Sequence, residues 1–244
     1  MDFQKGEIIL INKPYKWTSF DVVNKIRYVL KKIPPADLST LNLKPLPPRE
    51  GSNVKVGHAG TLDPLATGLL IICTGKLTKE IDSYQAKEKE YTGTFFLGAS
   101  TPSYDLETNV NRQFETSHID DTLIFETVKK FKGKIFQTPP AHSAVKIDGQ
   151  RAYKKARKGV DIKLEPKEIF IHEFEITKIE LPLIHFRIVC SKGTYIRSVA
   201  NDFGEALHSG AYLAALCRTR IGEFKLENAM TVEEFVEKFQ MAKV

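Results

Sequence analysis

A single carboxylate, Asp63, lies in the stretch of this sequence best suited to chemistry. Pro64 follows it directly, the apolar run Leu69–Cys73 comes soon after, and glycines stand at 57, 60 and 68. Proline fixes its own φ and disfavours the α region for the residue before it, while glycine lets backbone or a ligand approach closely. The pattern predicts a carboxylate held on a stiff loop beside a buried strand, as a nucleophile or general base requires. The same composition also fits an ordinary loop with a capping aspartate.

A second candidate stretch, from Cys190 to Arg197, has the pattern of a strand end followed by a helix start. Lys192 and the free N–H groups of the helix N-terminus favour an anion there, although any capped helix offers the same groups. Arg197 lies one turn into the helix, where its guanidinium can reach a carboxylate. Beside Asp63 it would favour the ionised form and fix its orientation.

A basic segment lies between Lys146 and Lys163, with seven basic and two acidic residues. We predict a helix from about Gln150 to Lys158, with Gly159 after its end. Four basic side chains fall at i, i+3, i+4 and i+7 on one face of this helix: Arg151, Lys154, Lys155 and Lys158. Such a face is either solvated or follows RNA phosphates, and the shortage of acids to pair with it favours RNA.

Short strands and helices alternate along the chain and must position these residues. Periodicity predicts strands at 8–11, 69–73, 91–97, 169–179, 183–190 and 211–221 and helices at 19–30, 78–86, 121–131, 194–207 and 232–241. Gly133 is expected to cap the third helix, and Thr231 opens a capping box for the last. Hairpin-joined strands interrupted by helices predict an α+β fold with a largely antiparallel mixed sheet flanked by helices and loops. We expect one domain over 1–244, with a proline-rich loop at 34–54 to which no role is assigned.

Composition limits the function classes. The net charge of +6 and pI near 9.0 permit a polyanionic partner without requiring one. Cys73, Cys190 and Cys217 lack CxxC spacing, so neither a disulfide framework nor a zinc knuckle is indicated, and buried reduced thiols are expected. No histidine cluster, Rossmann or P-loop pattern points to a metal or cofactor. Without an apolar leader or a run long enough to cross a bilayer, the protein is expected in the cytoplasm, away from membranes.

The fourteen residues Gly57–Leu70 resemble, almost letter for letter, the catalytic motif of the tRNA pseudouridine-55 synthases, the TruB family. The likeness covers most of residues 7–221. It implies the pseudouridine synthase fold with a catalytic cleft and an isomerase that needs no cofactor or metal. By the same resemblance Asp63 is the catalytic aspartate, Arg197 its partner, and Tyr91 the tyrosine that stacks on the target uracil and is implicated in removing the C5 proton. Read without the family, a tyrosine opening a strand is ordinary packing.

The resemblance also implies residues that contact the RNA. His58 would fill the space left by the flipped base, Lys79 corresponds to a lysine near the active site, and Leu216 matches a leucine packed beside it. Without the resemblance these are, respectively, a lone histidine, a solvated lysine and a core leucine. Residues 137–163 correspond to a thumb that closes over the T-arm of tRNA, with His142 where many relatives carry tyrosine.

The implied substrate is uridine-55 in the T-arm loop of tRNA, modified by a monomer with no obligatory protein partner. Residues 222–244 are too few for the PUA domain of many relatives, so none is expected. Two other functions remain open. A catalytically silent tRNA-binding or folding module would share the basic segment without needing Asp63, Tyr91 and Arg197 together. An aspartate-nucleophile hydrolase could use Asp63, but no His/Asp relay is recognisable.

Overall fold

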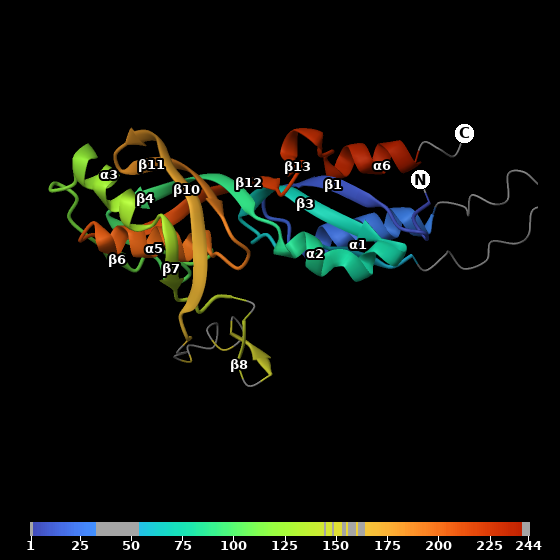
Figure 1. Cartoon of the computed structure of the whole chain (residues 1–244), viewed down its shortest axis with the longest axis horizontal. Coiled ribbons are helices and arrows are strands. Elements are labelled where there is room, and N and C mark those ends of the chain that lie inside the picture. The colour runs from blue at the N-terminus through green and yellow to red at the C-terminus, as the bar shows by residue number, and fades with distance from the viewer. Residues whose placement is uncertain are drawn as a thin grey trace, which may run out of the picture. The chain divides into compact units, whose positions relative to one another are not determined.

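The computed structural model describes residues 2–32, 54–143, 145–147, 149–152, 155, 160 and 164–240 (Figure 1). The chain divides into two compact units: unit 1 is Met1–Lys87 with Cys217–Val244, and unit 2 is Glu88–Leu216. Strand β12 (Ala211–Ile221) starts in unit 2 and ends in unit 1. The loop expected at 34–54 lies outside the described residues, apart from its last residue. No helix in the described ranges has the length and hydrophobicity needed to span a membrane.

Unit 1 is built on the antiparallel pair β1 (Ile8–Lys13) and β3 (Ala66–Thr74), in which Ile9 lies opposite Ile72 and Ile11 opposite Leu70. β2 (Val56–His58) also pairs with β3, β12 is the other neighbour of β3, and β13 (Phe224–Lys225) pairs with β12. Residues 69–73 are fully buried, which explains why β3 is a continuous apolar run without alternation.

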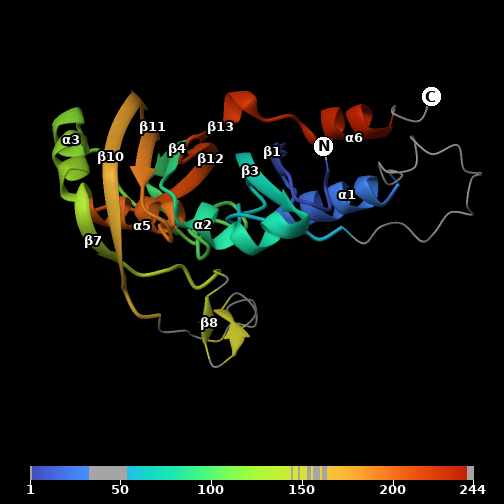
Figure 2. The ribbon, with the colours of Figure 1, turned by 45° about the vertical axis from the view of Figure 1, so that its right-hand side comes forward.

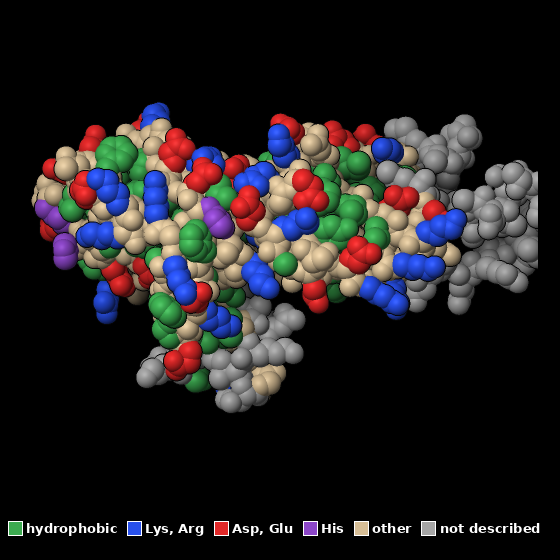
Figure 3. Space-filling model, in the orientation of Figure 1, with side chains coloured by type: hydrophobic (Ala, Val, Ile, Leu, Met, Phe, Trp, Pro, Cys, Tyr) green, Lys and Arg blue, Asp and Glu red, His purple; other side chains and the backbone are tan. Residues whose placement is uncertain are grey.

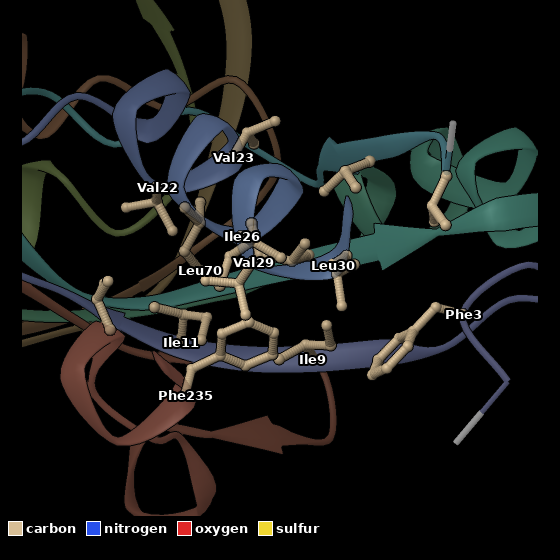
Figure 4. Close-up of a cluster of buried hydrophobic side chains, with 14 residues drawn as sticks. Phe3, Ile9, Ile11, Val22, Val23, Ile26, Val29, Leu30, Leu70 and Phe235 are labelled. Atoms are coloured by element: carbon tan, nitrogen blue, oxygen red, sulfur yellow. The ribbon is translucent and has the colours of Figure 1, made fainter. Parts of the chain in front are cut away.

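Helices cover both faces of the unit 1 sheet. α1 (Ser19–Lys31) and α6 (Val232–Gln240) pack on the face that carries Ile9, Ile11 and Leu70. Figure 4 shows side chains of α1, β1 and α6 meeting there, with Phe235 of α6 beside Ile11. The other face packs against η2 (Gly75–Glu80) and α2 (Ile81–Ala86), two short helices where one was predicted. A last turn, η3 (Leu226–Asn228), precedes α6.

Capping boxes start both long helices of unit 1. Thr18 and Asp21 form the box at α1, where the Thr18 hydroxyl accepts from the Asp21 N–H and the Asp21 carboxylate accepts from the Thr18 N–H. The predicted box at α6 is confirmed, because Thr231 and Glu234 exchange the same two hydrogen bonds. These caps satisfy N–H groups that a helix start leaves free.

Unit 2 contains the other strands of the nine-stranded sheet, in a run of antiparallel pairs. β4 (Lys89–Leu97) pairs with β11 (Leu183–Cys190), β11 with β10 (Lys167–Glu180) and β10 with β7 (Gly133–Gln137), and the first part of β12 lies on the other side of β4. β5 (Ala99–Ser100) and β6 (Arg112–Gln113) form a small separate ladder. The predicted α+β fold with a largely antiparallel sheet is confirmed.

Helices α3 (Asp121–Lys130) and α5 (Ile196–Ala206) pack beside this sheet (Figures 1 and 2). Phe203 of α5 lies within an aromatic core with Phe95, Phe174 and Phe131, at ring-centroid distances of 5.6–5.8 Å from them. Asp120 is the N-cap of α3, and its carboxylate accepts from the Leu123 N–H. Gly133 does not end it: Phe131 is the C-cap, and Gly133, with φ of +89°, begins β7.

The basic segment begins as a hairpin. β8 (Lys146–Ile147) pairs with β9 (Gln150–Arg151), with Lys146 opposite Arg151. The predicted helix is therefore wrong at its start, and Arg151 lies in a strand. Asp-Gly at 148–149 is a hairpin signal, and the φ of +77° at Gly149 suits a tight turn. Lys155 is helical and half-buried, while Lys154 and Lys158 lie outside the described residues.

Candidate active site

The Asp63 loop connects β2 to β3 in unit 1. Its backbone is fixed by hydrogen bonds from Lys16, which precedes α1, and from Ser19, the first residue of α1. The buried Ser19 hydroxyl accepts from the Leu62 N–H at 2.9 Å and donates to the Leu62 carbonyl at 3.2 Å. The Lys16 N–H donates to the Pro64 carbonyl at 2.9 Å, and the Ala66 N–H to that of Asp63 at 3.1 Å. Backbone groups of Leu62, Asp63 and Pro64 are therefore all hydrogen-bonded. The half-exposed side chain of Asp63 is thus attached to a fixed backbone.

Arg218 of β12 binds the chain before and after this loop. Its guanidinium is 1% exposed and donates to the carbonyls of Leu69 at 2.8 Å and Gly60 at 3.0 Å. Gly68 makes this approach possible, since a Cβ there would lie 2.4 Å from the Arg218 carbonyl oxygen, and its φ is +103°. The predicted close approach at Gly68 is therefore confirmed.

Lys13 is a second buried cation in the same place. Its ammonium group donates to three carbonyls, those of Trp17 at 2.6 Å, Pro14 at 3.0 Å and Pro64 at 3.3 Å. Burial lowers the pKa of Lys13 to about 8, against the opposing effect of the negative charge of Asp63. The loop before α1 and the Asp63 loop are therefore tied together by a positive charge next to the carboxylate.

His58 precedes the Asp63 loop at the end of β2. Burial and the positive charge of Arg218 lower the pKa of His58 below its ordinary value, while the Gly60 backbone acts in the opposite direction. Its Nδ1 is buried and has no hydrogen-bond partner among the described residues. The imidazole is therefore neutral at physiological pH, and its role toward a flipped base stays a prediction.

Arg197 lies in unit 2, in the first turn of α5, and is 3% exposed. Its carboxylate partner within that unit is Asp105, with Nε–Oδ2 at 3.7 Å. Its Nη atoms donate to the carbonyls of Ser103 and His142 at 3.2 Å. This ion pair was not foreseen, and the pairing of Arg197 with Asp63 stays a prediction. His142, which stands where many relatives carry tyrosine, contributes its backbone carbonyl here.

The segment that follows β7 is fastened to α5. Gln137 accepts from the Tyr195 N–H at 2.8 Å and donates to the Tyr195 carbonyl at 3.1 Å. Ser198 donates to the carbonyl of Thr138 at 2.8 Å. The start of the predicted thumb and the turn that carries Arg197 therefore form one hydrogen-bonded structure.

Comparison with known proteins decides the family. The family model "TruB family pseudouridylate synthase (N terminal domain)" matches residues 49–196. The chain is 53% identical over 239 residues to the tRNA pseudouridine synthase B of Flavobacterium johnsoniae, covering 98% of both chains. It is 50% identical over 237 residues to that of Bacteroides fragilis, covering 97% of this chain and 95% of the relative. The chain belongs to the TruB family.

A solved structure of the same fold extends the likeness. The chain matches a protein in the crystal structure of a Cbf5–Nop10–Gar1 complex with a TM-score of 0.71 and 28% identity. The match covers all of this chain and 57% of the other, so this chain corresponds to about half of that longer relative. The predicted pseudouridine synthase fold is thereby confirmed for this TruB-family chain.

The structure also places the remaining candidates of the TruB-family motifs. Tyr91 is 8% exposed and lies in β4 opposite Ile188. Leu216 is half-buried in β12, and Lys79 is exposed at the end of η2. Asp63, His58 and Lys79 belong to unit 1, and the other candidates to unit 2. Their roles stay predictions.

Sequence reasoning missed three charged residues: Lys13, Asp105 and Arg218. All are buried, and each is linked to its site across a long stretch of chain, as the Lys13–Pro64 and Arg218–Gly60 hydrogen bonds illustrate. Charged side chains are almost never fully buried unless paired. The one local hint was a lysine, Lys13, in the polar pair that directly follows the apolar run Ile8–Ile11.

Proposed function

We propose that this chain isomerises uridine to pseudouridine in tRNA, at uridine-55 of the T-arm loop. The observation that carries the proposal is the backbone-fixed Asp63 loop, in a chain that belongs to the TruB family. Two relatives of nearly the same length bear the name tRNA pseudouridine synthase B.

The reaction breaks the glycosidic C–N bond, rotates the base and rejoins it through C5, with loss of the C5 proton. It needs a carboxylate close to sugar and base and a group that takes the proton. Asp63 supplies the carboxylate, and Tyr91 stacks on the uracil and serves in the proton removal. Whether Asp63 attacks the base, attacks the sugar or promotes a glycal, its oxygen atoms must be held in place.

The hydrogen bonds around Asp63 support such preorganisation. Lys13 and the Lys16 N–H bind the carbonyl of Pro64, Ser19 binds Leu62, and Arg218 binds Gly60, so the backbone on both sides of the carboxylate is fixed before RNA arrives. A catalytic group held this way loses little entropy on reaching the transition state.

Extruding the target base costs a few kcal/mol of unstacking. A neutral, half-buried imidazole at His58 suits the space that the base leaves, since it brings no charge into the RNA stack. Leu216 and Lys79 are the other residues proposed near the uridine. Arg151, Lys154, Lys155 and Lys158 are proposed to contact the T-arm backbone from the thumb. We further propose that the protein acts as a monomer in the cytoplasm.

Tritium release tests the proposal. A tRNA transcript labelled at C5 of uridine should lose tritium with wild-type protein, and none with Asp63→Asn, because an amide has the carboxylate's shape without its charge or nucleophilicity. Asp82→Asn, at an exposed position of α2, is the matched control and should behave as wild type. Mapping should place the pseudouridine at position 55.

Two results would contradict the proposal. Product formed by Asp63→Asn at the wild-type rate would rule out the mechanism. Wild-type protein that binds tRNA tightly without releasing tritium would instead identify a silent tRNA-binding or folding module.

A further inference from the structure

The loop between β1 and α1 presents two side chains to solvent beside the Asp63 loop. Its backbone is bonded to that loop, since the Lys16 N–H donates to the Pro64 carbonyl at 2.9 Å and Lys13 joins the Trp17 and Pro64 carbonyls. Tyr15, however, is 51% exposed, and the Lys16 side chain is also exposed. Both side chains therefore stand on the backbone that holds Asp63, without taking part in its packing.

The side chains of Tyr15 and Lys16 lie close together. The Lys16 ammonium lies 5.7 Å from the centroid of the Tyr15 ring, within range of a cation–π contact. No ion pair joins Lys16 to a carboxylate in the described part of the chain. An exposed aromatic ring and a cation that pairs with no carboxylate among the described residues thus lie side by side.

Lys16 also occupies a backbone conformation that suits glycine. Its φ is +67°, in the left-handed region that few non-glycine residues adopt because Cβ comes too close to the following carbonyl oxygen. A glycine would make the same hydrogen bond to Pro64 through its own N–H without this strain. A strained residue whose side chain extends into solvent is typical of a functional position.

We propose that Tyr15 and Lys16 are an RNA-binding pair next to the active site, with Lys16 on a backbone phosphate and Tyr15 against the face of an unpaired base. Single-stranded RNA loops are recognised in this way, by aromatic side chains that stack on splayed bases and by cations that follow the phosphates. This inference rests on the proposed function, because it takes the nucleotides flanking the target uridine in the T-arm loop as the ligand.

Equilibrium binding of a T-arm stem–loop RNA by the full chain tests the pair. Lys16→Gln keeps the strain and removes the charge, so its Kd should rise about four- to sixfold at roughly 0.15 M salt, and the salt slope should fall by about 0.7–0.9. Lys16→Gly removes both the charge and the backbone strain. It should therefore bind RNA as weakly as Lys16→Gln, while its melting temperature equals or exceeds that of the wild type. Tyr15→Leu should weaken binding about fivefold or more.

Tyr28 and Lys32 provide a matched control within the same unit. Tyr28 is 52% exposed with the Lys32 ammonium 4.0 Å from its ring centroid, so the chemistry is the same. Tyr28 lies in the last turns of the 13-residue helix α1, and its C-cap Lys32 is about 20 Å from the helix start. Lys32→Gln should therefore bind RNA as the wild type does.

Equal losses for Lys16→Gln and Lys32→Gln would overturn the inference, since net charge alone would then explain them. Wild-type affinity of Lys16→Gly or Lys16→Gln would overturn it as well. The RNA-binding titrations are repeated with Lys16→Gln in the Asp63→Asn background. Binding by Lys16 does not depend on catalysis, so the loss of affinity should be the same there. Wild-type protein that binds the stem–loop without making pseudouridine refutes the proposed function, and leaves the loss at Lys16 measurable.

Discussion

Two buried cations, Lys13 and Arg218, bind backbone carbonyls on either side of Asp63. Hydrogen bonds from charged donors are about twice as strong as neutral ones, and a cation removed from water costs free energy unless its hydrogens are bonded. Lys13 joins the carbonyls of Trp17 and Pro64, and Arg218 joins those of Gly60 and Leu69. These hydrogen bonds offset the cost of burying the two charges, and they also fix the Asp63 loop. Burial lowers the pKa of Lys13 to about 8, so its charge can be titrated within the range of ordinary experiments.

Stability should therefore depend on pH through Lys13. Its pKa is lowered to about 8 in the folded protein from an ordinary 10.5, so between these values the unfolded chain holds more protons. The free energy of unfolding then rises with pH in this window, by at most about 1.4 kcal/mol per unit, and the full penalty remains below pH 8. Urea unfolding of wild type and Lys13→Met should diverge over this range.

The exposed Lys76 supplies the control for this titration. Lys76→Met should follow the wild type at every pH, since its side chain lies in water and takes no part in the hydrogen bonds of Lys13. A difference between wild type and Lys13→Met that stays constant from pH 8 to 10 would contradict the assignment.

The buried pair of Arg197 and Asp105 should show strong coupling. Removing one partner of a buried ion pair costs about 3–5 kcal/mol, because it leaves an uncompensated charge. Arg197→Met and Asp105→Ala should each approach this loss, while the double variant should lose less than their sum by about 1–3 kcal/mol. A double-mutant cycle by urea unfolding measures the coupling, and strictly additive losses would show that the 3.7 Å contact carries no energy.

At the scale of elements, α1 does more than fill the core of unit 1. Ser19 in its first turn is 2% exposed and binds both backbone groups of Leu62, next to Asp63. Ser19→Ala leaves these groups without their partner, at a cost of about 1–3 kcal/mol. The Leu62 amide should then exchange its hydrogen faster, and turnover should fall more than RNA affinity.

Ser83→Ala tests whether losing any helix hydroxyl has this effect. The Ser83 hydroxyl donates to the Glu80 carbonyl at an exposed site in α2, so its loss should leave the Leu62 amide unchanged. Unchanged exchange at Leu62 in Ser19→Ala would mean that the loop is held without the hydroxyl.

Periodicity predicted most elements, and its failures have local causes. The strand 211–221 was predicted with its observed bounds, since small and apolar residues predominate in it and no turn signal interrupts it. The helix predicted from Gln150 failed at its start, where Gln150 and Arg151 pair with Ile147 and Lys146 instead, because the Asp-Gly pair before them was not read as a turn signal. An Asp-Gly pair between two short segments is a strong hairpin signal. The helical spacing of the basic residues was the weaker indication of secondary structure.

At the scale of the whole molecule, unit 1 contains both ends of the chain, and β12 passes from one unit into the other. Resemblance of short motifs was enough to single out Asp63 and Arg197 as candidates. No local sequence pattern predicts that residues 1–87 fold together with 217–244. Arg218 was missed for this reason: its partners Gly60 and Leu69 lie about 150 residues earlier, and only the fold brings them together.

Charge is also a property of the whole molecule, and it sets the last prediction. The net charge is +6, yet on the face shown in Figure 3 Lys and Arg side chains are spread over both units and mixed with acids. Affinity for tRNA should then fall with salt, and the slope counts the phosphates neutralised. If the thumb binds RNA, Lys154→Gln with Lys155→Gln should reduce the slope by roughly 0.7–0.9 for each phosphate that is no longer neutralised.

A variant with the same net charge separates the thumb from the molecule's overall field. Lys129→Gln with Lys130→Gln removes two charges from the last turn of α3. Long-range attraction between protein and RNA depends on the total charge, so it would weaken equally in both double variants. Counterion release requires direct binding of phosphate, so a larger reduction of the slope in the thumb variant places phosphates there. Equal slopes in the two variants would show that the basic residues of the thumb act only through the net charge.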